Sequence, residues 1–179
     1  MTVPVQSDPA IDITCLPGEE SVCGGTMTCQ ALVQNTDGAQ LTATDIKALI
    51  DIPLGHTMVA SSLVVGSALG ATLDCVVAVA DQITCTGELP IDTQIQVNFD
   101  VALDDCECAS SYYFTTEASI SASNGDLDLT NNYDSWTTKI QSDIECGGEC
   151  EVPLQLIIES PSNGTSTRSS SIGVIAVVD

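Results

Sequence analysis

The stretch Thr93-Gln-Ile-Gln-Val-Asn-Phe-Asp-Val-Ala-Leu103 alternates apolar and polar residues along its length. Successive side chains of a β-strand point to opposite faces, so this stretch predicts a strand with one buried and one solvated face. The residues expected to point inward are Ile95, Val97, Phe99, Val101 and Leu103. Their apolar face needs a second layer to cover it, which favours two packed sheets.

Similar strand patterns lie on both sides of this stretch. Strands are expected over 11–14, 26–35, 46–52, 57–65, 112–122 and 133–141, with a hairpin over 73–86. Turn residues separate these strands roughly every 8–12 residues, and Val, Ile, Leu and Ala mixed with Ser, Thr, Asp and Asn favour short strands over helices. The pattern predicts an all-β fold, an immunoglobulin-like antiparallel β-sandwich over residues 11–141.

The two ends of the chain differ from this body. Residues 1–10 contain two prolines that disfavour helix, and we expect an extended N-terminal arm. Residues 142–179 predict a C-terminal β tail with two candidate strands, 152–158 and 172–178. The polar stretch 160–170 between them is typical of a turn or flexible leash.

Composition limits the classes of partner. The chain has 179 residues, and 25 acidic residues against three basic ones give a net charge of −22. Such a surface repels nucleic acid and anionic lipid. No window reaches the roughly 18 apolar residues of a membrane span, so membrane insertion is not expected. Nine cysteines favour an oxidising compartment, and we expect an extracellular or cell-surface location.

The cysteines of the body predict disulfides. Cys75 and Cys85 flank the turn of the 73–86 hairpin and could face each other across paired strands. Cys15 could staple a short loop by bonding to Cys23, and Cys29 is a competing partner for it. Because nine is an odd number, one thiol remains, and Cys29 on an inward face is the candidate; it could instead bond to a neighbouring subunit.

Four further cysteines could connect the body to the tail. Cys106, Cys108, Cys146 and Cys150 could form two disulfides or supply four thiolates to zinc. Cys-x-Cys spacing is tight for a zinc knuckle, and an oxidising compartment favours disulfides.

An acidic turn offers a candidate calcium site. Asp126, Asp128 and Asn131 combine carboxylate and amide oxygens, which calcium prefers. Asx turns use the same residues, and the full EF-hand loop is absent. A second, weaker candidate comprises Asp104, Asp105 and Glu107. Calcium is the one cofactor that the sequence suggests.

Catalysis has little support in the sequence. His56 is the single histidine, and acid–base or nucleophilic chemistry would require it beside a positioned partner. No such partner is indicated by the spacing, so an enzyme is not expected.

Five short motifs occur in an order that is typical of one family. They are Gly25-Thr-Met-Thr28 leading to Val33-Gln-Asn-Thr36, then Asp51-Ile-Pro-Leu-Gly55, the 75–85 cysteine hairpin, Glu117-Ala-Ser-Ile120 and Asp126-Leu-Asp-Leu-Thr-Asn-Asn132. In this order the body resembles the conserved repeat domain, a domain of unknown function, of bacterial and archaeal cell-surface proteins. The resemblance implies an immunoglobulin-like sandwich and a structural or adhesive role, and it carries no active site.

The main functional hypothesis is a structural subunit of an extracellular filament, tube or surface layer. A homopolymer would form by β-strand addition, with one subunit donating a terminal strand to its neighbour. The candidate donor residues are Ile172, Val174, Ile175, Ala176, Val177 and Val178. The arm 2–13 is a second candidate donor, and a hairpin of 152–158 with 172–178 on the chain's own sheet is the alternative without exchange.

The alternative function is an adhesin, a stalk or a ligand-binding module from a cell-surface repeat protein. Such a module would not need to polymerise, so removal of the tail would leave its assembly state unchanged.

Overall fold

The computed structural model describes the body of the chain. The described residues are 5–18, 20–22, 24–78, 81–103 and 111–141. The chain divides into two units, Met1–Gly148 and Glu149–Asp179, and every described residue belongs to the first. The candidate strands 152–158 and 172–178 lie outside the described residues.

The first sheet is built around β9 (Thr93–Ala102), the strand with the clearest sequence pattern. Its order is β1 (Pro9–Leu16), β3 (Thr26–Asn35), β9 and β5 (Thr57–Met58), and β6 (Val64–Val65) also pairs with β9. All pairs in this sheet are antiparallel.

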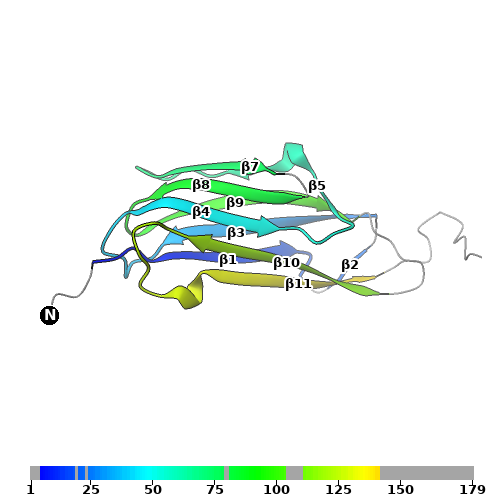
Figure 1. Ribbon diagram of the computed structural model, residues 1–179. Helices are drawn as coiled ribbons and strands as arrows, with labels where there is room; N and C mark the ends of the chain where they lie inside the picture. Colours follow the sequence, from blue (N-terminus) through cyan, green and yellow to red (C-terminus); the bar gives the residue numbers. More distant parts are fainter. Residues whose placement is uncertain (1–4, 19, 23, 79–80, 104–110, 142–179) are drawn as a thin grey trace, which may run out of the picture. The chain divides into compact units, whose positions relative to one another are not determined.

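The second sheet runs in the order β2-β11-β10-β4-β8-β7 (Figure 1). The strands are β2 (Glu20–Val22), β11 (Tyr133–Gln141), β10 (Tyr112–Ser121), β4 (Ala43–Asp51), β8 (Gln82–Leu89) and β7 (Thr72–Val77). Its pairs are antiparallel except β2–β11, which is parallel. The predicted all-β sandwich is therefore confirmed, with one parallel pair that the sequence did not indicate.

The apolar faces of the two sheets form one core. The five inward residues predicted for the 93–103 stretch are all buried, each at most 3% exposed. Phe99 of β9 and Phe114 of β10 are its largest fully buried side chains. Burial of each large apolar side chain contributes roughly 1.5–3 kcal/mol, so alternation on β9 and β10 accounts for much of the stability.

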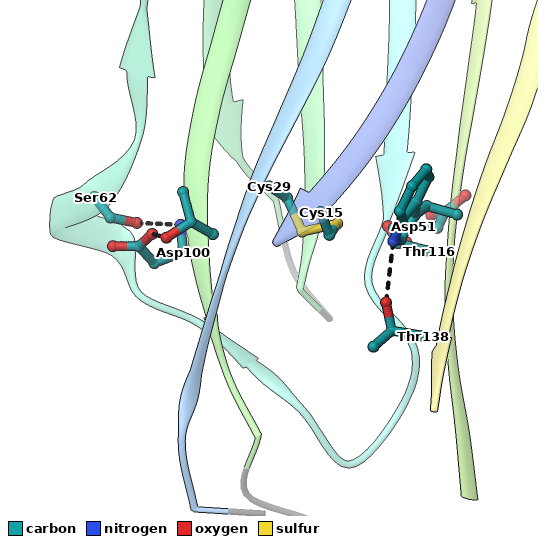
Figure 2. The surroundings of a disulfide bond; sticks show 9 residues. Cys15, Cys29, Asp51, Ser62, Asp100, Thr116 and Thr138 are labelled. Atoms are coloured by element: carbon teal, nitrogen blue, oxygen red, sulfur yellow. Dashed lines mark hydrogen bonds between the residues drawn. A yellow bond between two sulfur atoms is a disulfide. The ribbon is translucent and has the colours of Figure 1, made fainter. Parts of the chain in front are cut away.

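The predicted strand over 57–65 is interrupted. The structure divides it into β5, a 3₁₀ turn η1 (Ala60–Ser62) and β6. The Ser62 hydroxyl donates to the carbonyl of Val59 at 2.6 Å and accepts the N–H of Asp100 at 2.7 Å (Figure 2). A serine that bonds to the local backbone competes with the strand ladder, which explains the break.

The folded body includes residues assigned to the N-terminal arm. β1 begins at Pro9, while Ser7 and Asp8 are buried just before it. Within the described ranges, no helix is long and apolar enough to cross a membrane.

Candidate functional site

The first disulfide joins β1 to β3. Cys15 is bonded to Cys29, with 4.0 Å between their Cα atoms, and the two side chains meet between the strands in Figure 2. The predicted Cys15–Cys23 bond and the predicted free thiol at Cys29 are wrong. The reason is register, because Cys15 lies directly opposite Cys29 in the β1–β3 ladder. Cys23 lies outside the described residues.

The second disulfide joins β7 to β8. Cys75 is bonded to Cys85, again with 4.0 Å between the Cα atoms, and the two residues are directly opposite in the hairpin. This is the pairing that the hairpin pattern indicates. Like Cys23, the cysteines Cys106, Cys108, Cys146 and Cys150 lie outside the described residues.

Both disulfides attach an edge strand to its neighbour. β1 ends the first sheet and β7 ends the second, so each has one strand partner within the described residues. An edge strand has half the ladder hydrogen bonds of a central strand and frays more readily. The cross-links hold both edges in place.

The two edges differ in how they are covered. We call the outer side of β1 the closed edge. The Asp134 carboxylate on β11 accepts the N–H of Ile13 at 2.8 Å, and β1 contacts β11 along this side. Ile11, Ile13 and Cys15 are at most 2% exposed. The closed edge therefore has little room for another strand.

We call the outer side of β7 the open edge. Val76 is 61% exposed and Val77 is 37% exposed, and Leu69 in the loop before β7 is 99% exposed. In the described part of the chain, no side chain caps this edge as Asp134 caps β1. An uncapped edge strand with exposed apolar residues is a template for strand pairing.

The predicted calcium residues form a capped turn. The Asp128 carboxylate accepts the N–H and the hydroxyl of Thr130, which caps the 3₁₀ turn η2 (Leu129–Asn131). These hydrogen bonds lower the pKa of Asp128 below 3.8. The Asp126 carboxylate accepts the N–H of Asp128 and the side-chain amide of Asn132.

Asn131 points its amide nitrogen to Asp8, at 3.2 Å from the carboxylate. Three of the oxygens proposed for calcium thus already accept protein hydrogen bonds. The side-chain oxygens of Asn131 and Asn132 are buried and accept none from the described residues. No group of three or more His, Cys, Asp or Glu side chains in that part of the chain is arranged around a metal position. Calcium stays a sequence prediction, and its second candidate at 104–107 lies outside the described residues.

A buried polar network near β1 was missed by the sequence patterns. Asn35 is fully buried, its amide donates to the carbonyls of Leu41 and Leu89, and its oxygen accepts the N–H of Asp8. The Asp8 carboxylate accepts the hydroxyl of Thr36. Asp8-Pro9 and Asn35-Thr-Asp-Gly38 look like ordinary turns in the sequence, so only the fold reveals that they meet.

His56 is part of the packing at one end of the sandwich. It is 4% exposed, its ring stacks on Tyr112 at 5.6 Å between centroids, and it meets Phe114 edge-on at 5.2 Å. A ring enclosed in this way is poorly placed to exchange protons with a solvent-borne substrate.

Several solved structures have a fold similar to that of this chain. The CARDB domain from Pyrococcus furiosus, solved in complex with di-metal ions, has a TM-score of 0.51 and 9% identity over 76% of this chain and 90% of that chain. The collagen-binding domain of a Staphylococcus aureus adhesin gives 0.47 and 11% over 76% and 99%. The major pilin SpaD of Corynebacterium diphtheriae gives 0.44 and 12% over 73% and 33%.

No protein-family model matches the sequence, and no curated protein matches it significantly. The similarity to the CARDB domain therefore supports the fold alone, an immunoglobulin-like β-sandwich. This agrees with the fold that the motif order implied, and two disulfides are typical of an oxidising setting.

Proposed function

We propose that the chain is a non-enzymatic structural subunit of an extracellular filament, tube or surface layer. The sandwich body is the repeating unit, and the terminal strand 172–178 of one copy joins a sheet of the next copy. The result is a homopolymer held by β-strand addition.

One observation carries this proposal. Among the described residues, the buried core extends from Ile11 to Ile140, and both sheets of the body contribute to it. The sequence after Gln141 nevertheless contains a seven-residue apolar stretch, 172–178, of the kind that is buried in sheets. Because the described body already packs two sheets around one core, we assign this stretch to a sheet of another copy.

Two further features agree with a structural role. The two cross-strand disulfides restrain the edge strands, which suits a subunit that transmits load along an assembly. His56, the one residue suited to acid–base catalysis near neutral pH, is enclosed by Tyr112 and Phe114.

The test is deletion of residues 160–179 from the full chain. Electron microscopy and size-exclusion chromatography of the purified protein should show long assemblies for the complete chain and monomers for the truncated one. A matched control replaces 160–170 with a shuffled order of the same residues, which preserves the strand and should preserve assembly. Unchanged assembly after truncation, or a complete chain that never assembles, contradicts the proposal.

A second candidate is an adhesin or stalk module. It is favoured by the outer face of β10 and β11, where Tyr113 is 72% exposed and Tyr133 is 54% exposed beside polar and charged side chains such as Lys139 and Glu117. Exposed tyrosines are common in recognition surfaces. The same truncation separates the two functions, because a stalk module remains monomeric with or without its tail.

A further inference from the structure

We propose that the open edge of β7 (Thr72–Val77) is the acceptor for the strand 172–178 of a neighbouring copy. This inference rests on the proposed function and specifies where the donated strand binds. It follows from the backbone geometry of the β7–β8 hairpin, from the capping and the length of the other edge strands, and from the charge of the donor.

The disulfide fixes which backbone groups of β7 face outward. Directly opposed residues of antiparallel strands alternate between hydrogen-bonded pairs, about 5.5 Å apart at Cα, and non-hydrogen-bonded pairs, about 4.5 Å apart. Cys75 and Cys85 are 4.0 Å apart and therefore form a non-hydrogen-bonded pair. Ala78 lies three residues after Cys75, and its N–H donates to the carbonyl of Gln82 at 2.7 Å. Ala78 and Gln82 are thus a hydrogen-bonded pair, as expected for residues an odd number of positions from a non-hydrogen-bonded pair.

The outward groups are therefore those of Leu73, Cys75 and Val77. Each presents an N–H and a C=O away from β8, at intervals of two residues. This is the spacing that an added strand needs to form a ladder. β7 has six residues, and the donor stretch has seven, so the two match in length.

On β1, the residues that face outward alternate as on β7, but one of their outward N–H groups already has an acceptor. Cys15 and Cys29 are also 4.0 Å apart, so Ile13, two residues away, likewise turns its N–H outward. That N–H already donates to Asp134. The comparison agrees with the phase rule within this molecule and makes β1 a poorer acceptor than β7.

The other strands that end a described sheet are short. β5 and β6 have two residues each and are separated by η1, and at this point the Ser62 hydroxyl occupies the N–H of Asp100 on β9 (Figure 2). β2 has three residues. Among the strands that end a described sheet, β7 alone combines six residues with an outer side that no described side chain caps, and it borders the sheet in Figure 1.

The core is incompletely covered beside β7. Several apolar residues that pack against the core around β6 and β7 are only partly buried: Leu63, Val65, Ala68, Ala71 and Cys75. An apolar strand laid along β7 would cover part of this margin. Burial of apolar surface contributes about 25 cal/mol per Å², in addition to the backbone ladder.

Charge favours this donor. The protein carries a net charge of −22, so most contacts between two copies repel. The donor stretch 172–178 contains no charged residue, and β7 contributes only Asp74. Their contact therefore places a single carboxylate, that of Asp74, beside an uncharged stretch.

The experiment uses the complete chain with Val77→Pro. Proline removes the outward N–H of Val77 and leaves the hydrogen bonds between β7 and β8 in place, because those belong to residues of the other phase. The matched control, Val77→Thr, keeps the N–H and the β-branched shape. We expect Val77→Pro to lower the assembled fraction at least 10-fold and Val77→Thr to retain it, with both variants folded by circular dichroism.

A mixing experiment keeps the inference testable without relying on one variant. The chain truncated after residue 159 retains its acceptor, and the Val77→Pro chain retains its donor. Neither should polymerise alone, and their mixture should form a 1:1 dimer in size-exclusion chromatography with light scattering. A Val76→Lys chain, which places a charge beside the same edge, serves as a second acceptor-blocked partner if Val77→Pro does not fold.

The outcomes separate the two proposals. Normal assembly by folded Val77→Pro and Val76→Lys chains, together with loss of assembly on truncation, overturns the β7 acceptor and leaves strand donation in place. Normal assembly by the truncated chain overturns both. A complete chain that stays monomeric, with its own tail on β7, also overturns exchange between copies.

Discussion

The two edge strands β1 and β7 have the same covalent reinforcement and opposite surroundings. Each is bonded to its one strand neighbour by a disulfide between directly opposed cysteines. β1 is buried against β11 and capped by Asp134, whereas Val76 and Val77 of β7 are exposed. Proteins usually blunt an edge that must not pair. Within the described residues, one edge is therefore protected from pairing and the other is not.

The largest expected effect comes from removing the disulfides. The cross-linked residues are 14 apart for Cys15–Cys29 and 10 apart for Cys75–Cys85, so loop-closure entropy predicts about 3 kcal/mol for each. Cys15 and Cys29 are completely buried, and alanine there also leaves a cavity. We expect a loss of about 4 kcal/mol for Cys15→Ala/Cys29→Ala and about 3 kcal/mol for Cys75→Ala/Cys85→Ala.

Urea denaturation without reductant measures both free energies of unfolding. The Cys75→Ala/Cys85→Ala chain should also assemble poorly, because an unfixed β7 is a weaker acceptor. A larger loss of stability at the open edge than at the closed edge contradicts the comparison.

Gly87→Ala is expected to have the next largest effect. Gly87 lies on β8 opposite Leu73 of β7, and a Cβ atom there would be 1.9 Å from the carbonyl oxygen of Thr72. The strand must move away, at a cost of about 3 kcal/mol. Thermal unfolding checks this. Gly18→Ala is the matched control, since its Cβ would meet Trp136 at an ordinary 3.6 Å, and a similar loss there would contradict the assignment.

Asp134→Ala should open the closed edge. The change leaves the N–H of Ile13 without its acceptor and should destabilise the fold by about 2 kcal/mol. Asp134→Asn keeps an acceptor oxygen and should lose less than about 1 kcal/mol. Analytical ultracentrifugation of truncated chains carrying each change should show new self-association for alanine only. Equal behaviour of the two variants would argue against capping by Asp134.

The smallest effect concerns the turn that leads into β11. Because hydrogen bonds from Thr130 lower the pKa of Asp128 below 3.8, its contribution to stability is present above pH 3.8 and is lost as the pH falls through the folded-state pKa. Asp128→Ala should therefore lower the melting temperature slightly at pH 7. The difference from the unaltered chain should shrink at pH values below 3.8, and a difference that grows in acid contradicts this role.

Local patterns predict the strands well where one face is buried. β9 and β10 alternate clearly because every second side chain enters the core, and their bounds agree with the sequence within about two residues. The 57–65 stretch was predicted less well, since bonds from Ser62 to the backbone interrupt it. Such a competition between side chain and ladder leaves no periodic signal.

Contacts between residues far apart in the sequence could not be predicted from local patterns. The Cys15–Cys29 bond depends on the register between β1 and β3, whereas spacing alone favoured Cys23 as the partner of Cys15. The cap on β1 comes from Asp134, which is 121 residues away from Ile13. The candidate donor was visible in the sequence as an apolar stretch, whereas its acceptor required the phase of the β7–β8 ladder.

Amide hydrogen exchange tests the central claim most directly. Exchange in the assembled complete chain should be compared with exchange in the monomeric chain lacking residues 160–179. Strand addition predicts slower exchange on assembly at Leu73, Cys75 and Val77, with little change along β1, where the edge is already closed. Unchanged exchange at these three β7 amides in the assembled protein would contradict the claim that a neighbour's strand binds there.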